Sequence, residues 1–142
     1  MIRTITLAEV EFIAFRLARE SYTFDEPIPD FATRFPNILE SCLLSPFQMF
    51  NKKPLYKGLV GRAAVLFYFM IKNHPFQNGN KRIAMTTLFC FLYLNKTWLK
   101  VNDYKLYQFA VWVAESLPES KDAVVQEITR FLKAHLADLK QG

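Results

Sequence analysis

The sequence predicts an all-α fold: a compact bundle of about six helices, with a small β-hairpin flap as the one candidate extended element. Apolar residues recur at helical spacing along most of the chain, and we find no alternating strand of useful length. The 142 residues suit a single domain, 1–142, and contents of 51% hydrophobic and 22% charged residues exclude a disordered or low-complexity chain. Such a chain buries a sizeable core without disulfides or a structural metal.

A first helix is expected from Leu7 to about Glu20. Thr6 and Glu9 have the spacing of a capping box, in which the hydroxyl accepts a free helix N–H and the carboxylate reaches back to the capping residue. Apolar side chains then recur every three or four residues, at Leu7, Val10, Ile13, Ala14 and Leu17. This spacing is typical of an amphipathic helix.

The next elements are a loop punctuated by prolines and a short helix at about 37–44. The prolines are Pro27, Pro29 and Pro36, and the apolar positions of the short helix are Ile38, Leu39, Leu43 and Leu44.

Residues 45–58 are too irregular for a helix and are expected to form an extended flap or a weak hairpin. The segment holds two prolines, the turn-forming Asn51, two lysines and three aromatic residues, which are Phe47, Phe50 and Tyr56. Apolar side chains outside a core helix indicate a docking surface, where a target protein pairs with the extended backbone and the rings serve as anchors. The alternative is that the rings fold back on the core, and the sequence favours neither.

Two helices, at about 59–73 and 80–95, are apolar almost all round, which is typical of central helices surrounded by others. The next helix is expected to run from Asp103, which would cap it, to about Glu115. Pro118 then stops the chain from continuing as a helix, and a last helix is expected from Ser120 to about Leu139.

Composition excludes several functional classes. The longest apolar runs, 63–71 and 83–94, fall short of the ~20 residues that span a bilayer, and no signal peptide is evident, so we expect a cytoplasmic protein without membrane contact. The formal net charge of +5 favours an anionic partner, but the bases form no run or stripe, which argues against direct nucleic-acid binding. Cys42 and Cys90 make no disulfide framework or zinc pattern, and we expect a buried thiol at Cys90.

A compact polar loop, from His74 to Arg82, separates the two apolar helices. Gly79 lets the backbone turn tightly and approach a ligand, and Asn80 is placed to cap the next helix, whose free N–H groups then face an anion. Lys81 and Arg82 add positive charge at a helix N-terminus, which is unfavourable unless an anion compensates. His74 is suited to proton transfer near neutral pH.

Each feature of this loop has an ordinary explanation on its own. A histidine before a proline is usually a surface or capping residue, a Gly-Asn pair is usually a turn, and a Lys-Arg pair in a first helical turn is often only solvated. Their occurrence together in one short loop favours a phosphate-binding site with an acid–base residue.

The loop resembles the motif of the Fic/Doc family, His-x-Phe-x-(Asp/Glu)-Gly-Asn-(Gly/Lys)-Arg. The matching residues are His74, Phe76, Gly79, Asn80 and Arg82. Two positions are similar to the death-on-curing (Doc) branch, because Lys81 stands where Fic chains have glycine and Met85 where they have a further arginine. The likeness extends back through 37–46 and forward to about Asn95.

This resemblance implies an enzyme that transfers part of ATP to a protein hydroxyl, with ATP and Mg²⁺ as cofactors. Fic proteins usually transfer AMP, whereas Doc toxins transfer the γ-phosphate to elongation factor Tu and so block translation. His74 would be the general base for a Ser or Thr hydroxyl, and Phe76 would anchor the loop to the core. The implied nucleotide-binding residues are Gly79, Asn80, Lys81 and Arg82. The acidic residue that holds Mg²⁺ in the family is Asn78 here, and magnesium prefers carboxylates to neutral amides.

Fic proteins are often restrained by a helix with the pattern (Ser/Thr)-x-x-x-Glu-(Gly/Asn), and we find no such segment, so the resemblance implies restraint in trans by a small antitoxin. Three interpretations stay open: γ-phosphate transfer, AMP transfer, and a catalytically weak module that binds nucleotide or a partner. Lys81 favours the first, and Asn78 favours the last, against which the intact His74 argues.

Overall fold

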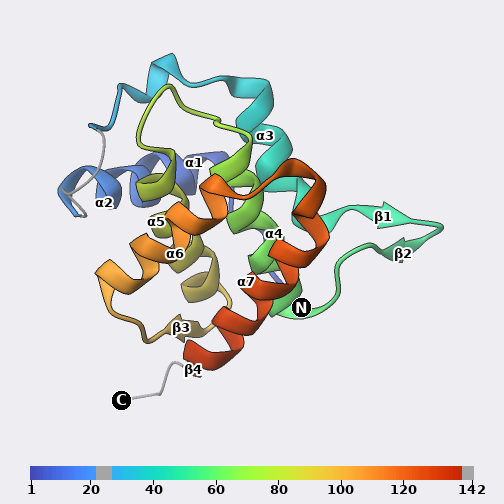
Figure 1. The fold of residues 1–142 in the computed structure, drawn as a ribbon. Helices are drawn as coiled ribbons and strands as arrows, with labels where there is room; N and C mark the ends of the chain where they lie inside the picture. The colour runs from blue at the N-terminus through green and yellow to red at the C-terminus, as the bar shows by residue number, and fades with distance from the viewer. Residues whose placement is uncertain (22–26, 139–142) are drawn as a thin grey trace.

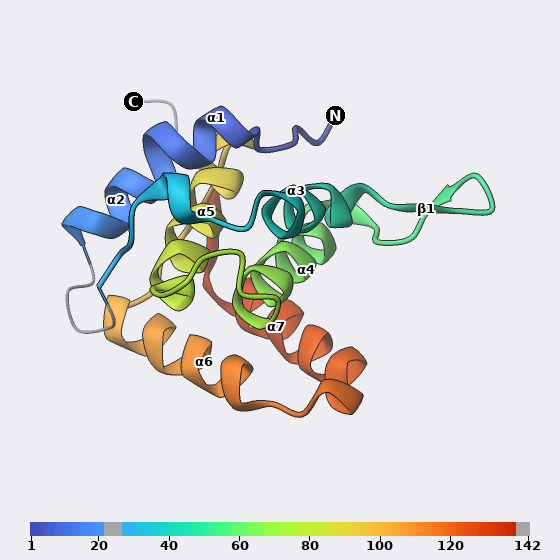
Figure 2. The ribbon, with the colours of Figure 1, turned by 90° about the horizontal axis from the view of Figure 1, so that it is seen from above.

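The computed structural model describes residues 1–21 and 27–138, which form six helices and two small two-stranded sheets (Figure 1). The predicted all-α class is confirmed. At the centre lie α4 (Gly58–Lys72) and α5 (Asn80–Leu94). Seen from above, they are enclosed by the N-terminal helix on one side and by α6 (Asp103–Glu115) and α7 (Lys121–His135) on the other (Figure 2).

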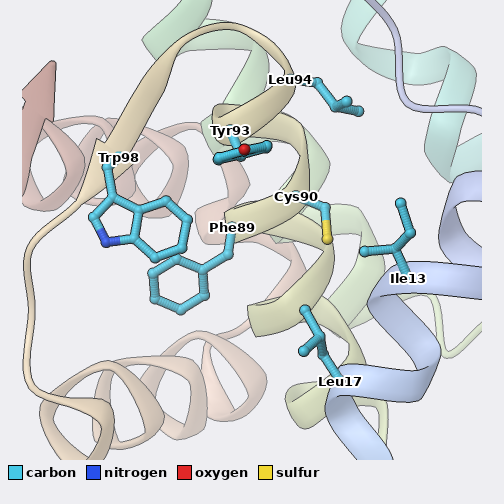
Figure 3. Close-up of a pocket in the computed structure, with 7 residues that line it drawn as sticks. All are labelled: Ile13, Leu17, Phe89, Cys90, Tyr93, Leu94 and Trp98. Carbon is cyan, nitrogen blue, oxygen red and sulfur yellow. The ribbon is translucent and has the colours of Figure 1, made fainter. Parts of the chain in front are cut away.

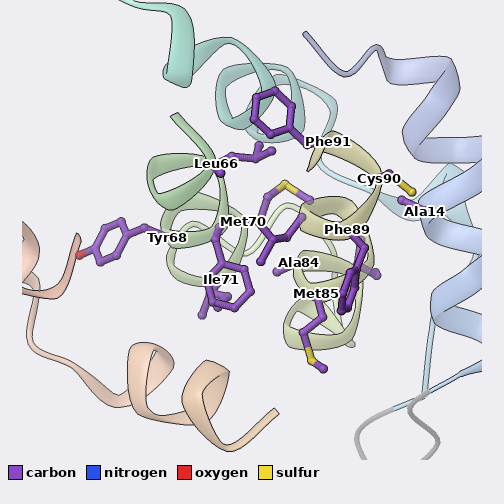
Figure 4. Close-up of a cluster of buried hydrophobic side chains, with 14 of the residues drawn as sticks. Ala14, Leu66, Tyr68, Met70, Ile71, Ala84, Met85, Phe89, Cys90 and Phe91 are labelled. Carbon is purple, nitrogen blue, oxygen red and sulfur yellow. The ribbon is translucent and has the colours of Figure 1, made fainter. Parts of the chain in front are cut away.

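The two central helices bury side chains on almost every face, as their apolar sequences predict. Leu66, Met70 and Ile71 of α4 and Ala84 and Met85 of α5 are each at most 1% exposed and meet in the core (Figure 4). Fully burying a side chain of the larger kinds contributes roughly 1.5–3 kcal/mol. Because α4 ends and α5 begins at the polar loop, this core fixes both ends of that loop.

The N-terminal helix is continuous but not regular. It comprises α1 (Leu7–Glu9), a π-helical turn (Val10–Ala14) and α2 (Phe15–Glu20). The predicted capping box is confirmed: Thr6 Oγ1 accepts the N–H of Glu9 at 3.1 Å, and Glu9 Oε1 accepts the N–H of Thr6 at 2.9 Å.

The π-helical turn changes which side chains of this helix face the core. A π turn holds more residues than an α turn, so the residues that follow it are rotated. The buried residues are Val10, Ala14, Phe15 and Ala18. Ile13 and Leu17, on the apolar face that the spacing indicates, are 44% and 42% exposed.

The short helix and the flap form where the sequence predicts them. α3 (Pro36–Leu44) buries Leu39 and Leu43, while two of its predicted apolar positions, Ile38 and Leu44, are exposed. β1 (Met49–Phe50) then pairs antiparallel with β2 (Lys53–Pro54). Asn51 and Lys52 between them both have positive φ, as the tightest hairpin turns require.

The C-terminal region departs from the sequence prediction in two places. Asn102 caps α6, not Asp103, because the Asn102 side chain accepts the N–H groups of Tyr104 and Lys105. The last helix ends at His135, not near Leu139, which lies outside the described residues. β4 (Leu136–Asp138) instead pairs with β3 (Thr97–Leu99), since Leu99, distant in sequence, offers Leu136 a cross-strand partner.

Within residues 1–21 and 27–138, none of the helices has both the length and the apolar character of a membrane span. Cys90 is buried, as its apolar sequence context predicts.

Candidate active site

The first residues of the loop between α4 and α5 are held in place by a backbone contact with the segment before α3. His74 has φ +50°, a left-handed conformation that residues with a side chain adopt rarely, although histidine adopts it more often than most. Pro75, which follows, is buried, and its carbonyl accepts the N–H of Phe35 at 2.9 Å, just before α3. The imidazole of His74 therefore stands exposed on a fixed backbone.

Phe76 points into the protein and is only 1% exposed. Its ring lies 5.5 Å from that of Phe15 and 5.9 Å from that of Phe31, measured between centroids. The structure thus places it in the position of an anchor, holding the loop against the N-terminal helix and the segment before α3.

Asn80 closes the loop through its side chain. Its Oδ1 accepts the N–H of Phe76 at 3.0 Å, and its Nδ2 donates to the Phe76 carbonyl at 2.8 Å. Because one residue's backbone engages both ends of the carboxamide, the orientation of the amide is determined. Nδ2 also lies 3.4 Å from Nδ1 of His74, so the same side chain contacts the imidazole.

The predicted side-chain cap at Asn80 is therefore wrong. Gly79 is the N-cap of α5, with φ +73°, and Asn80 is the first helical residue, its amide already occupied by Phe76. Gly79 is buried, and a Cβ built on it would lie 2.6 Å from Cδ1 of Ile28. A glycine is required here by the positive φ and by the close approach of the chain at Pro27 and Ile28.

Two cations follow at the start of α5, with different environments. Lys81 is half-buried in the first turn. Arg82 is only 4% exposed, and its Nη2 donates to the carbonyls of Ala18 and Ser21, so it caps the C-terminal end of α2. Arg82 thus links the loop helix to the N-terminal helix, a role that the motif alone did not indicate.

The Fic/DOC family model matches residues 4–92, which include the N-terminal helix, α3, the hairpin, α4, the loop and most of α5. The chain belongs to the Fic/DOC family. No curated protein and no solved structure matches the chain.

The family's Mg²⁺ is poorly matched by the residues of this loop. Asn78, at the position of the family's acidic residue, is exposed and offers a neutral amide. The sequence has no Asp or Glu between Glu40 and Asp103, and the described residues contain no group of three His, Cys, Asp or Glu that could hold a metal ion. The described residues of this loop therefore do not by themselves fit a metal ion.

The predicted docking residues lie away from His74. The hairpin adjoins the start of α4 and the loop follows its end, so they stand at opposite ends of this 15-residue helix, about 22 Å long (Figure 1). Phe50 is 66% exposed at the hairpin. Phe47 is half-buried, with its ring 6.3 Å from that of Phe91 and 5.0 Å from the guanidinium carbon of Arg62, and Tyr56 is also half-buried. Strand pairing at the hairpin would therefore engage a target protein at the opposite end of α4 from His74.

Sequence reasoning missed two contributors to the site: the link from Asn80 to Phe76, and the cover of Gly79 by Pro27 and Ile28. The four-residue spacing from Phe76 to Asn80 was a usable signal for the first. Nothing local signals the second, because it joins segments far apart in the sequence.

Replacing Asn80 by alanine should loosen the loop. Asn80→Ala leaves the backbone N–H and C=O of Phe76 buried without their partner, which costs about 2–4 kcal/mol of unfolding free energy. Urea denaturation measures this loss. The matched control is Asn78→Ala, an exposed position that should stay within about 0.5 kcal/mol of the wild type. Equal stabilities of the two variants would show that the Phe76 link does not hold the loop.

Proposed function

We propose that this Fic/DOC protein is a Doc-like toxin that transfers the γ-phosphate of ATP to a Ser or Thr hydroxyl of a translation protein, with elongation factor Tu as the first candidate. The observation that carries the proposal is the loop itself, where Asn80 places an exposed imidazole beside the N-terminus of a long buried helix. That arrangement combines a group suited to accepting a proton with a site suited to holding phosphate.

In the proposed reaction His74 accepts the proton of the target hydroxyl. The hydroxyl oxygen attacks the γ-phosphorus, an oxygen–phosphorus bond forms, and the bond between the γ-phosphorus and the bridging oxygen breaks, so that ADP leaves. The contact of Asn80 with Nδ1 supports this role because it orients the ring. A base held in position typically contributes ~10²–10⁴ to the rate.

The phosphates are assigned to the N-terminus of α5. The N-terminus of α5, behind Gly79, is the positive end of the helix dipole and attracts an anion, and Lys81 adds positive charge at the same place. The lack of Asp and Glu between Glu40 and Asp103 removes competing negative charge from this whole stretch of sequence. Arg82 supports the site through its bonds to the end of α2, which fix the first turn of α5.

Magnesium enters this proposal as the counter-ion of ATP, bound mainly by the phosphates, and the neutral amide of Asn78 is the weak ligand that the loop would add. We also propose, from the family resemblance, a cytoplasmic location and a small antitoxin that restrains the enzyme in trans.

The nature of the transferred group is tested by intact-mass analysis of elongation factor Tu after incubation with ATP and Mg²⁺. A gain of one phosphate supports the proposal. A gain of one AMP identifies the Fic-type reaction. The lysine at position 81, where Fic chains have glycine, argues against that outcome. No gain for any translation protein favours a module that only binds nucleotide or a partner, for which Asn78 speaks.

Replacing His74 should abolish transfer without unfolding the protein. Because the side chain is exposed, His74→Ala is expected to melt near the wild-type temperature while the transfer rate falls by ~10²–10⁴. His135→Gln, at the chain's other histidine on α7, is the matched control and should keep the wild-type rate. Full activity of His74→Ala would exclude this histidine as the base.

Docking at the hairpin remains a proposal, now as a contact remote from the chemistry. Phe50→Ser removes an exposed ring, so we expect a higher KM for the target protein at unchanged melting temperature and unchanged kcat. Phe47→Ser is the contrasting variant, because it opens the packing against Phe91 and should lose about 1–3 kcal/mol of stability. An unchanged KM for Phe50→Ser would remove the hairpin from target binding.

A further inference from the structure

An apolar groove of about 270 Å³ opens on the side of the molecule formed by α2 and the second half of α5 (Figure 3). Its lining residues are Ile13, Leu17, Phe89, Cys90, Tyr93, Leu94 and Trp98. Burial raises the pKa of the Cys90 thiol to about 11, with a smaller contribution from the negative charge of Glu9. The thiol is therefore protonated at neutral pH and serves as part of the apolar wall.

The sequence and the fold disagree about the residues at the edge of this groove. Ile13 and Leu17 belong to the apolar spacing of the N-terminal helix, yet the π-helical turn leaves both side chains largely outside the core. Phe12 beside them is 61% exposed, and Tyr93 and Trp98 across the groove are also exposed. The chain thus displays apolar side chains here that an amphipathic helix normally buries.

The size of this patch indicates an interface. A large side chain carries ~150–250 Å² of surface, so the exposed fractions of these five residues add up to roughly 400–600 Å² of apolar surface at and next to the groove. The largest apolar patch on a soluble monomer is typically about 300–600 Å² and is often functional. A standard interface takes about 800 Å² from each partner, of which roughly 60% is apolar, so the patch matches one side of such an interface.

Two features favour a second copy of this chain as the occupant. An interface with twofold symmetry uses the same patch on both partners, so the patch has to hold both a projecting and a receiving element. Phe12 is 61% exposed and precedes Ile13, which lines a hollow large enough to receive an aromatic ring. The exposed polar residues of α2 are Arg16, Arg19 and Glu20. Arg19 pairs with Asp30 at 3.4 Å, and Arg16 and Glu20 are one cation and one anion, so the helix meets no net repulsion from a second copy.

We infer that the protein forms a twofold-symmetric dimer through this surface, with Phe12 of each copy inserted into the groove of the other. The groove lies along the second half of α5, whereas the loop with His74 precedes the first residue of that helix. Dimer formation therefore leaves the candidate active site open. The inference does not depend on the proposed transfer reaction.

Molar mass measured by light scattering behind size exclusion, from low to several hundred micromolar protein, tests the inference. The wild type should move from the mass of one chain to that of two. Phe12→Ser should raise the dimer dissociation constant by roughly 30-fold or more, as loss of an interface anchor does. Leu117→Ser is the matched control, since Leu117 is 62% exposed just beyond the end of α6, lines no part of this groove, and its loss should leave the constant unchanged.

Tryptophan emission gives an independent measurement. In a Trp112→Phe background Trp98 is the remaining tryptophan, and its emission should shift to shorter wavelength with rising protein concentration as the groove fills. A single-chain mass at the highest concentration, or equal dissociation constants for the Phe12 and Leu117 variants, overturns the inference whatever other chain the groove then binds.

Discussion

The pair of hydrogen bonds between the Asn80 carboxamide and the Phe76 backbone is the constraint on which the candidate site depends. It closes the loop in the buried layer between α4 and α5, where water cannot replace either bond. The Phe76 ring is then held in the core, Gly79 takes its positive φ, and α5 starts directly after it. The side-chain amide of Asn80 also contacts the imidazole of His74, so a change in the loop geometry would also move the imidazole.

The N-terminal helix connects this site to the rest of the molecule. Its inner face packs on α5, its end receives two hydrogen bonds from Arg82, and its outer side forms one wall of the apolar groove. A cation of the family motif is thus used in part as a helix cap, which explains why a charged side chain is buried beside the start of α5. A partner bound in the groove would contact the helix whose end Arg82 holds.

Local patterns predicted the helices well, and the failures have a common physical cause. The capping box at Thr6, the two apolar helices and the residues of the loop were all visible in the sequence, because propensity, spacing and motif chemistry are local. The strand at 136–138 was not visible in the sequence, since it forms by pairing with residues 97–99, which are distant in the chain. The exposure of Ile13, the cover of Gly79 by Ile28, and the distance between Phe50 and His74 also depend on contacts or placements that no local pattern encodes.

The claim that the start of α5 holds phosphate is tested most directly by titrating ¹⁵N-labelled protein with ATP and following the backbone amide resonances. The account predicts that the largest shifts fall on the amides of Gly79, Asn80, Lys81 and Arg82, and that inorganic phosphate reproduces them at higher concentration. Shifts confined to other segments, or no response of these four amides at saturating ATP, would contradict it.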